Sequence, residues 1–233
     1  FHVKPLYKGK GPRSDPMRYR PIALMCTPMK ALEMILEARL RKHLESLKVL
    51  HPNQSGARTG RSTLENKLML REIIRCRKGN TVVAYIDNAK AYDMCNRELL
   101  FDQMKLFGIA GKMFRMIKEV LSNVHAQLII NGVLTDRFPL SNGVKQGSPL
   151  SPLLYIVYIT PIMTLVDETK KGIQLREGLM ITVLGFVDDL ALITPDTKSM
   201  KIVFANLMNI SKAWNIKLNI EKCHITSTRT RAQ

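Results

Sequence analysis

Two adjacent carboxylates, Asp188 and Asp189, lie within the apolar run MITVLGFVDDLALITP (180–195). Neighbouring negative charges repel and raise one another's pKa, so this placement costs stability unless a cation or a proton is shared. A third carboxylate, Asp87, ends the apolar run TVVAYID (81–87). If both runs are strands of one sheet, three carboxylates meet at one point and form the oxygen-rich site that Mg²⁺ prefers. The expected chemistry is phosphoryl transfer assisted by two metal ions bound at this site. A turn with two solvated aspartates is the alternative explanation of the pair alone.

The charge of the chain indicates a polyanionic partner. The 233 residues include 36 Lys and Arg against 19 Asp and Glu, a net charge of +17. Residues 1–80 hold 18 of the basic and 6 of the acidic side chains, so we expect the front of the chain to face phosphates. A solvated basic surface is the alternative. A membrane surface is a weaker candidate partner, because the longest apolar stretch (153–166) is too short to span a bilayer and contains Pro161.

The cysteines indicate a reducing compartment. Their spacing fits neither a zinc site nor a small disulfide framework, and no signal peptide is visible; the residues are Cys26, Cys76, Cys95 and Cys223. We therefore expect free thiols and an intracellular protein.

Hydrophobic periodicity and turn residues predict an α+β chain. One helix follows Pro28 and runs to Leu47, and a capping-box pattern at Ser62 starts a second helix that ends near Gly79. Asn131-Gly132 predicts a hairpin, and the runs 179–187 and 190–194 are expected to be the two strands of a second hairpin, which carries the Asp pair. The other expected elements are a buried strand at 81–87, helices at about 96–107 and 111–123, an apolar helix kinked or broken at Pro161, a helix at 195–214 and closing strands from 217 to 228. Helices are expected mainly at the front, followed by an antiparallel sheet backed by helices.

Six short motifs occur in a fixed order along the chain: YRPIAL (19–24), QSGARTGRST (54–63), DNAKAYD (87–93), GVKQGSPLSPLL (143–154), GFVDDLAL (185–192) and LNIEK (218–222). Together they resemble the fingers and palm of a reverse transcriptase, particularly those of non-LTR retroelements and group II introns. The resemblance covers nearly the whole chain. It implies a right-hand polymerase core with fingers at 1–80 and a palm at 81–233, while parts of 97–142 pack with either subdomain. No thumb is recognisable.

The resemblance also implies the catalytic groups. Asp87 and Asp188 are expected to bind two Mg²⁺ ions, with Mn²⁺ as an alternative, and Asp189 is expected to assist. Lys222 resembles the family lysine that neutralises or protonates the leaving pyrophosphate, with a surface lysine as the alternative.

Further residues are implied in nucleotide selection. Gln146 and Gly147 are expected to line the pocket of the template and the incoming nucleotide. Tyr92 is expected beneath the nucleotide sugar, where its ring would clash with a 2′-hydroxyl; a core tyrosine is the alternative. We expect Asp93 to be a structural hydrogen-bonding residue rather than a metal ligand.

Basic residues of the front complete the expected site. Lys8, Lys10 and Arg20 are candidates for gripping the triphosphate of the nucleotide. Arg58 and Arg61 are candidates for binding template phosphates, which gives affinity without sequence information.

The implied function is RNA-directed DNA synthesis, with an RNA template, a DNA primer, their hybrid and dNTPs as partners. An intracellular location is expected, nuclear in the case of a eukaryotic element. A catalytically silent RNA-binding scaffold, a decayed inactive fragment and an RNA-dependent RNA polymerase are the rivals. Three positions depart from the usual family pattern without removing a ligand: Asn88, Ser148 and Val187.

Overall fold

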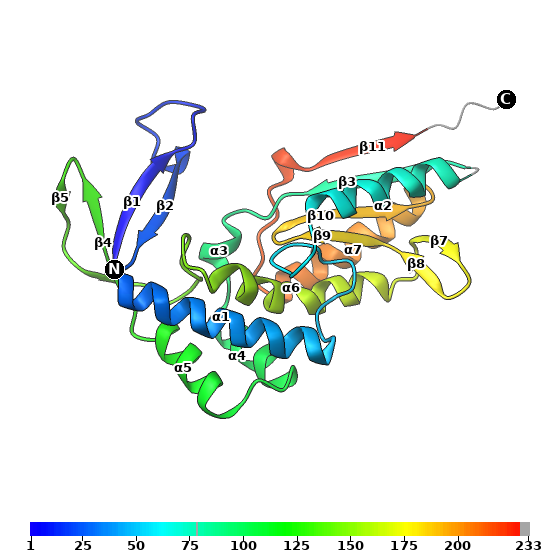
Figure 1. Cartoon of the computed structure of the whole chain (residues 1–233). Helices are drawn as coiled ribbons and strands as arrows, with labels where there is room; N and C mark the ends of the chain where they lie inside the picture. The colour runs from blue at the N-terminus through cyan, green and yellow to red at the C-terminus, as the bar shows by residue number, and fades with distance from the viewer. Residues whose placement is uncertain (78, 229–233) are drawn as a thin grey trace.

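The computed structural model describes residues 1–77 and 79–228 and arranges the chain as shown in Figure 1. The helices are α1 (Thr27–Leu47), α2 (Thr63–Cys76), α3 (Ala91–Met94), α4 (Arg97–Leu106), α5 (Gly111–Leu121), α6 (Ser151–Asp167) and α7 (Thr197–Ala213), with 3₁₀ turns η1 (Pro16–Arg18) and η2 (Ile220–Lys222). The strands are β1 (His2–Tyr7), β2 (Tyr19–Leu24), β3 (Thr81–Ile86), β4 (His125–Ile130), β5 (Val133–Leu134), β6 (Phe138–Pro139), β7 (Ile173–Arg176), β8 (Leu179–Ile181), β9 (Val183–Phe186), β10 (Asp189–Thr194) and β11 (His224–Thr228). The α+β class is confirmed.

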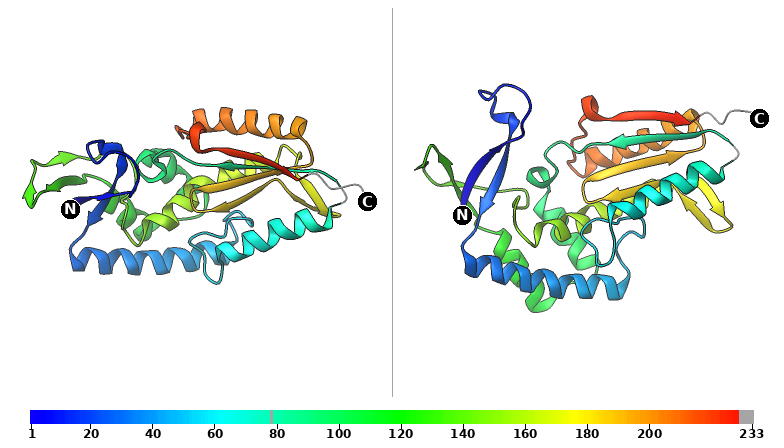
Figure 2. Two further views of the ribbon diagram at one scale, coloured as in Figure 1. Left: turned by 90° about the horizontal axis from the view of Figure 1, so that it is seen from above. Right: turned by 45° about the horizontal axis from the view of Figure 1, so that its top comes forward.

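The sheet that carries the carboxylates is antiparallel, with strand order β11-β3-β10-β9. Helices cover both faces: α2 lies on one side and α7 on the other (Figure 2). Alternate residues of the strands face opposite layers, because Leu190 and Leu192 belong to the main core while Leu184 and Ile193 pack around Ile73 of α2. Burial on both faces explains why the run 81–87 shows so little alternation.

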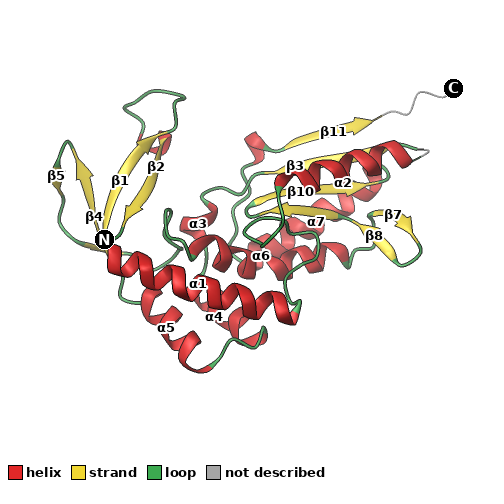
Figure 3. Ribbon diagram, in the orientation of Figure 1, coloured by secondary structure: helices red, strands yellow, loops and turns green. Residues whose placement is uncertain are grey.

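A second sheet, at the other end of the molecule, joins strands from distant parts of the chain (Figure 3). Its order is β2-β1-β4-β5, β6 also pairs with β4, and β1 runs parallel to β4. The hairpin predicted at Asn131-Gly132 is confirmed, and both turn residues have the positive φ angles that a tight hairpin requires. Residues 125–139 therefore join the sheet of the front strands, while α2 packs on the other sheet. The division into fingers and palm at residue 80 stays a prediction.

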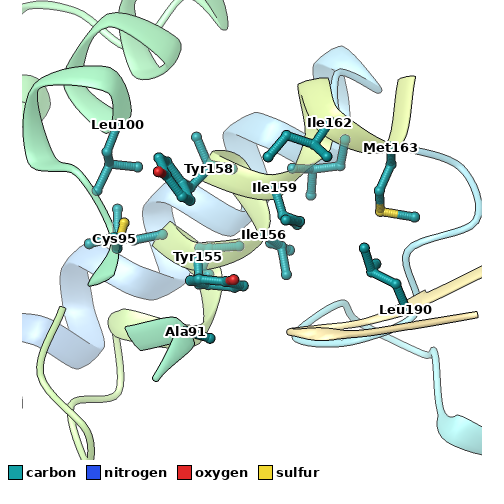
Figure 4. Packing of buried hydrophobic residues seen from close by; sticks show 14 of the residues in the cluster. Ala91, Cys95, Leu100, Tyr155, Ile156, Tyr158, Ile159, Ile162, Met163 and Leu190 are labelled. Carbon is teal, nitrogen blue, oxygen red and sulfur yellow. The ribbon is translucent and has the colours of Figure 1, made fainter. Parts of the chain in front are cut away.

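The longest buried segment is α6, whose side chains fill the main core (Figure 4). The sequence predicted a kink or a break at Pro161, and the break is wrong, because the helix continues from Ser151 to Asp167. Burial on every side of this helix outweighs the hydrogen bond that Pro161 cannot donate. Within residues 1–77 and 79–228, no helix has both the length and the apolar character needed to cross a membrane.

Two local expectations also need correction. Ser62 does precede α2, but its side chain makes no capping hydrogen bond, so the capping box is not formed. The run 179–187 was expected to be one strand, yet it is divided into β8 and β9. The division falls at Thr182, whose backbone N–H donates to Asp167 Oδ1 at 3.3 Å. The other predicted helices and the hairpin around the Asp pair are confirmed within a few residues, and the closing segment is η2 followed by the single strand β11.

Candidate active site

Strand pairing brings the three predicted carboxylates to one end of the antiparallel sheet. Asp87 directly follows β3, and Asp189 begins β10. Because Leu190 pairs with Ile86 in these antiparallel strands, the register continues with Asp189 opposite Asp87. Asp188 lies in the turn before β10, where its backbone carbonyl accepts a hydrogen bond of 2.8 Å from Asn88 Nδ2. The opposition of strand ends predicted from the sequence is confirmed.

The electrostatics of these carboxylates reflect their closeness. The pKa of Asp188 is raised, first by burial and then by the negative charges of Asp189 and Asp87. The pKa of Asp189 is also raised by burial and by Asp87, while the Lys222 ammonium acts in the opposite direction. Burial disfavours the ionised form and like charges add to that effect, so this end of the sheet favours the arrival of a cation.

The donor chemistry suits a divalent metal ion, although the side chains are not closed around one. Within residues 1–77 and 79–228, no three or more His, Cys, Asp or Glu side chains are gathered as a metal centre. The available donors are carboxylate oxygens, which hard divalent cations prefer. A cationic group already contacts them, because Lys222 Nζ lies 3.2 Å from Asp87 Oδ2. The Lys222 side chain is 66% exposed, so this ion pair is weak and exchangeable. Metal ligation by Asp87, Asp188 and Asp189 stays a prediction.

Tyr92 lies beside the carboxylates and also rests on the core. It belongs to α3, and its ring is stacked on Tyr155 with centroids 5.4 Å apart. Burial, followed by the charge of Asp188, raises the pKa of Tyr92 to about 12. The hydroxyl therefore stays protonated at neutral pH. The tyrosine is both a packed residue and a neighbour of Asp188.

The loop that carries Gln146 and Gly147 crosses between α3 and β2. Gln146 Nε2 donates to both Asp93 carboxylate oxygens, at 3.2 and 3.3 Å. Ala23 N–H donates to the Gln146 carbonyl at 2.7 Å. Gly147 has φ +104°, and a Cβ there would lie 3.1 Å from the Ala23 carbonyl oxygen, so the close approach favours glycine. The hydrogen-bonding role predicted for Asp93 is confirmed.

Buried charges that the sequence reasoning missed anchor this loop. The Glu33 side chain is fully buried in α1, lies 2.5 Å from Lys145 Nζ and accepts a hydrogen bond from the Ser148 hydroxyl. At the other end of the loop, Arg97 donates to the carbonyls of Leu140, Asn142 and Gly143. A signal for Glu33 was present, because it continues the buried stripe of Leu36, Leu40 and Leu44. An acidic residue in such a stripe predicts a buried partner.

The basic residues of the first hairpin are accessible. Lys8 donates to the Met17 carbonyl at 2.9 Å, and its charge opposes the burial that raises the pKa of Asp93. Lys10 and Arg20 are exposed, on the β1–β2 loop and on β2. These exposed positions are accessible to a triphosphate, and the contact of Lys8, Lys10 and Arg20 with it stays a prediction.

The two arginines of the 51–61 loop differ. Arg58 is only 9% exposed in its side chain and lies 2.6 Å from Glu45, with further hydrogen bonds to the carbonyls of His51 and Gln54. Its donors are occupied within the protein, so this geometry does not favour the expected contact of Arg58 with template phosphates. Arg61 donates to the Pro52 carbonyl at 2.8 Å and keeps an exposed side.

A hollow of about 490 Å³ opens next to Asp189, between α2 and the sheet. Its lining combines the aromatic residues Tyr85 and Phe186 with Lys67. Aromatic rings offer stacking surfaces to bases and lysine offers a charge to phosphates, so the hollow suits a nucleic-acid strand.

The turn that joins β9 to β10, formed by Val187 and Asp188, contains an unusual backbone conformation. Val187, directly before Asp188, has φ +58°. A β-branched residue rarely adopts this left-handed conformation, which costs about 1–3 kcal/mol and persists only where surrounding contacts enforce it.

Comparison with known proteins identifies the family. The model of the family described as reverse transcriptase (RNA-dependent DNA polymerase) matches residues 8–232. A Pol polyprotein from the type-1 retrotransposable element R2 of Popillia japonica is 30% identical over 171 residues, covering 72% of this chain and 28% of that protein. The RNA-directed DNA polymerase from mobile element jockey of Drosophila melanogaster is 27% identical over 229 residues, covering 92% of this chain and 24% of that protein. The chain thus spans less than a third of the length of both relatives.

A solved structure shares the fold. Telomerase from Candida tropicalis, in complex with the TWJ fragment of telomeric RNA, superposes with a TM-score of 0.62 at 15% identity, covering 89% of this chain and 34% of that chain. With the family match across nearly all residues, the arrangement of paired strands and carboxylates has one consistent explanation: the chain belongs to the reverse transcriptase family.

Proposed function

We propose that this chain is the fingers and palm core of an RNA-directed DNA polymerase, and that it is part of a longer retroelement protein. It adds deoxynucleotides to the 3′-hydroxyl of a DNA primer on an RNA template. The observation that carries the proposal is the position of Asp87, Asp188 and Asp189 at one end of paired strands β3 and β10, beside Tyr92.

The three carboxylates are proposed to hold two Mg²⁺ ions. Ions held there would supply the positive charge that phosphoryl transfer requires. The carboxylates provide the oxygen ligands, and the repulsion that raises the pKa values of Asp188 and Asp189 is relieved on binding. Lys222 would donate to the leaving pyrophosphate, and its weak, exposed ion pair with Asp87 leaves it free to do so.

Selection of the nucleotide falls to residues that are held rigidly. The Tyr92 ring, supported by Tyr155, lies where it excludes a 2′-hydroxyl and so favours dNTPs. Gln146 and Gly147 form one wall of the nucleotide pocket. Hydrogen bonds of Gln146 with Asp93 and Ala23 hold this wall in place. Lys8, Lys10 and Arg20 contact the triphosphate from the first hairpin, and the hollow beside Asp189 receives the strand.

A primer-extension assay tests the proposal. A labelled DNA primer on an RNA template is incubated with the chain, dNTPs and Mg²⁺, and products are resolved by length. We expect only short products from the wild type, a few additions per binding event, and at least about 100-fold less product from Asp188→Asn, since a metal ligand is removed. Asp136→Asn is the matched control, because Asp136 is exposed in the β5–β6 connection.

Other outcomes decide between the rivals. Binding of an RNA–DNA hybrid with no extension in Mg²⁺ or Mn²⁺ would contradict the polymerase and favour an RNA-binding scaffold or an inactive fragment. Preferential incorporation of ribonucleotides would favour an RNA-dependent RNA polymerase instead.

A further inference from the structure

The side chain of Gln54 contacts the turn of Val187 and Asp188 directly. Gln54 lies in the loop between α1 and α2 and is fully buried. Its Oε1 accepts a hydrogen bond of 2.9 Å from Val187 N–H, and its Nε2 donates one of 3.2 Å to the Val187 carbonyl. Oε1 also accepts from Gly56 N–H at 2.9 Å. One amide therefore satisfies both polar main-chain groups of Val187.

The orientation of this amide is fixed by its partners. The two groups that meet Oε1 are N–H donors, and Nε2 meets two acceptors, the Val187 carbonyl and, at 3.8 Å, the sulfur of Met163. If the amide were rotated so that Oε1 and Nε2 changed places, the NH₂ group would face the two N–H donors and the oxygen would face the Val187 carbonyl, so these hydrogen bonds would be lost. Gln54 thus suits the turn in a single orientation.

The residue held in this way is the strained one. Val187 has φ +58°, although a branched Cβ disfavours the left-handed region. Without an external restraint, the segment before Asp188 would relax to an extended conformation and redirect the following carboxylates. The two hydrogen bonds of Gln54 supply such a restraint at the strained residue itself.

The loop around Gln54 is fitted to the same turn. Ser55 N–H donates to the Gly185 carbonyl and Gly185 N–H donates to the Asn53 carbonyl, both at 2.9 Å. A Cβ at Gly56 would lie 2.3 Å from Val187 N, so no larger residue fits there without movement. The loop therefore fixes the backbone of Gly185 and Val187.

We propose that Gln54 is a positioning residue that sets the main-chain conformation of Val187 and thereby aims Asp188 and Asp189. This inference rests on the proposed polymerase function for its catalytic consequence. Gln54 is buried behind the turn, so its loss lowers kcat and leaves the affinity for nucleic acid and the KM for dNTP nearly unchanged.

The test combines a conformational and a kinetic measurement. Gln54→Met keeps the length of the side chain and removes its hydrogen bonds to Val187 and Gly56. Gln127→Met is the matched control, since Gln127 makes one hydrogen bond to a main-chain carbonyl in the other sheet. Amide hydrogen exchange is followed by mass spectrometry over residues 183–190 of the metal-free chain, and primer extension gives kcat and KM.

We expect the amide of Val187 to exchange at least about tenfold faster in Gln54→Met than in the wild type or in Gln127→Met. We expect kcat to fall at least about tenfold in Gln54→Met, with KM within about twofold of the wild type.

A rescue variant separates positioning from general stability. Glycine adopts positive φ without strain, so Val187→Gly should make Gln54 less necessary. In the Val187→Gly background, the fold decrease in kcat caused by Gln54→Met should be less than half of the fold decrease that it causes in the wild-type background. Independent sites would show the same fold decrease in both backgrounds. Because glycine also supports the turn by itself, this comparison remains informative if Gln54→Met alone folds poorly.

Each contrary result has its own meaning. Unchanged exchange over 183–190 in Gln54→Met, or equal kcat losses in both backgrounds, would overturn the positioning role. A wild-type chain that makes no product would contradict the proposed function. Hydrogen exchange would still test whether Gln54 holds the main chain of Val187, because that measurement does not depend on catalysis.

Discussion

The ring of Tyr92 lies parallel to the ring of Tyr155, with the two planes inclined by only 9°. Tyr155 belongs to α6 and is 1% exposed, among the side chains that Figure 4 shows. Tyr92 therefore cannot move toward the core without disturbing the longest buried helix. A residue that selects a sugar by steric exclusion must resist displacement, and this stack provides the resistance.

The first prediction concerns sugar selection. In Tyr92→Val, incorporation of ribonucleotides relative to deoxynucleotides should rise at least about tenfold, or about 1.4 kcal/mol. Removing the ring removes the obstacle to a 2′-hydroxyl. Single-nucleotide incorporation with matched dNTP and rNTP pairs measures the ratio, and Tyr92→Phe, which keeps the ring, should resemble the wild type. An unchanged ratio in Tyr92→Val would show that another residue selects the sugar.

The second prediction is a trade of stability against function at Asp188. Its negative charge is buried near Asp189 and Asp87, so Asp188→Asn should stabilise the metal-free protein. We expect the melting temperature in EDTA to rise by roughly 2–4 °C, which corresponds to about 1 kcal/mol for a chain of this size. Mg²⁺ should then stabilise the wild type more than the variant. A variant that melts below the wild type in EDTA would contradict the repulsion between these carboxylates.

The third prediction concerns the buried ion pair of Glu33 and Lys145. Glu33→Ala leaves the Lys145 ammonium buried without its partner and should lower the free energy of unfolding by about 3–5 kcal/mol. Replacing both residues, as Glu33→Leu with Lys145→Met, should recover most of that loss, since no charge is then stranded. Urea unfolding followed by circular dichroism measures both effects. Equal destabilisation in the single and double variants would rule out a direct coupling of the pair.

The fourth prediction separates phosphate-binding residues from structural ones. Arg61→Ala should bind an RNA–DNA hybrid more weakly, and the dependence of its log affinity on log salt should be shallower by about 0.9 if one phosphate contact is lost. Arg58→Ala should leave that salt dependence unchanged and lower thermal stability, because Glu45 loses its partner. Gel shifts over a series of salt concentrations measure the slopes. A shallower slope in Arg58→Ala would restore Arg58 as a template ligand.

Features of the fold that depend on local pattern could be predicted. The three- and four-residue spacing located α1, and two positive-φ formers located the β4–β5 turn. The apolar run 81–87 indicated a strand covered on both faces, which α2 and α7 provide. The opposition of Asp87 and the Asp188-Asp189 pair followed from the same reasoning, because Asp87 ends one apolar run and the pair interrupts another.

What could not be predicted depends on partners far apart in sequence. The sequence shows Arg58 as one basic residue among many, and only the folded chain brings Glu45 within reach of its guanidinium. Likewise, the pattern around Pro161 contains no information on how completely α6 is enclosed. The pairing of β1 with β4 joins residues more than 120 positions apart, a distance over which periodicity gives no register.

The order of strands in the carboxylate-bearing sheet has a consequence for synthesis of the chain. β3 pairs with β10 and β11, both of which follow it by more than 100 positions, and Val187 follows Gln54 by 133. A nascent chain therefore exposes β3 with two unpaired edges until its partners leave the ribosome, and such edges readily recruit other strands. Contacts over these separations also form slowly. Competent enzyme should accumulate better at low temperature or with a chaperone present, and truncation before β10 should yield insoluble protein.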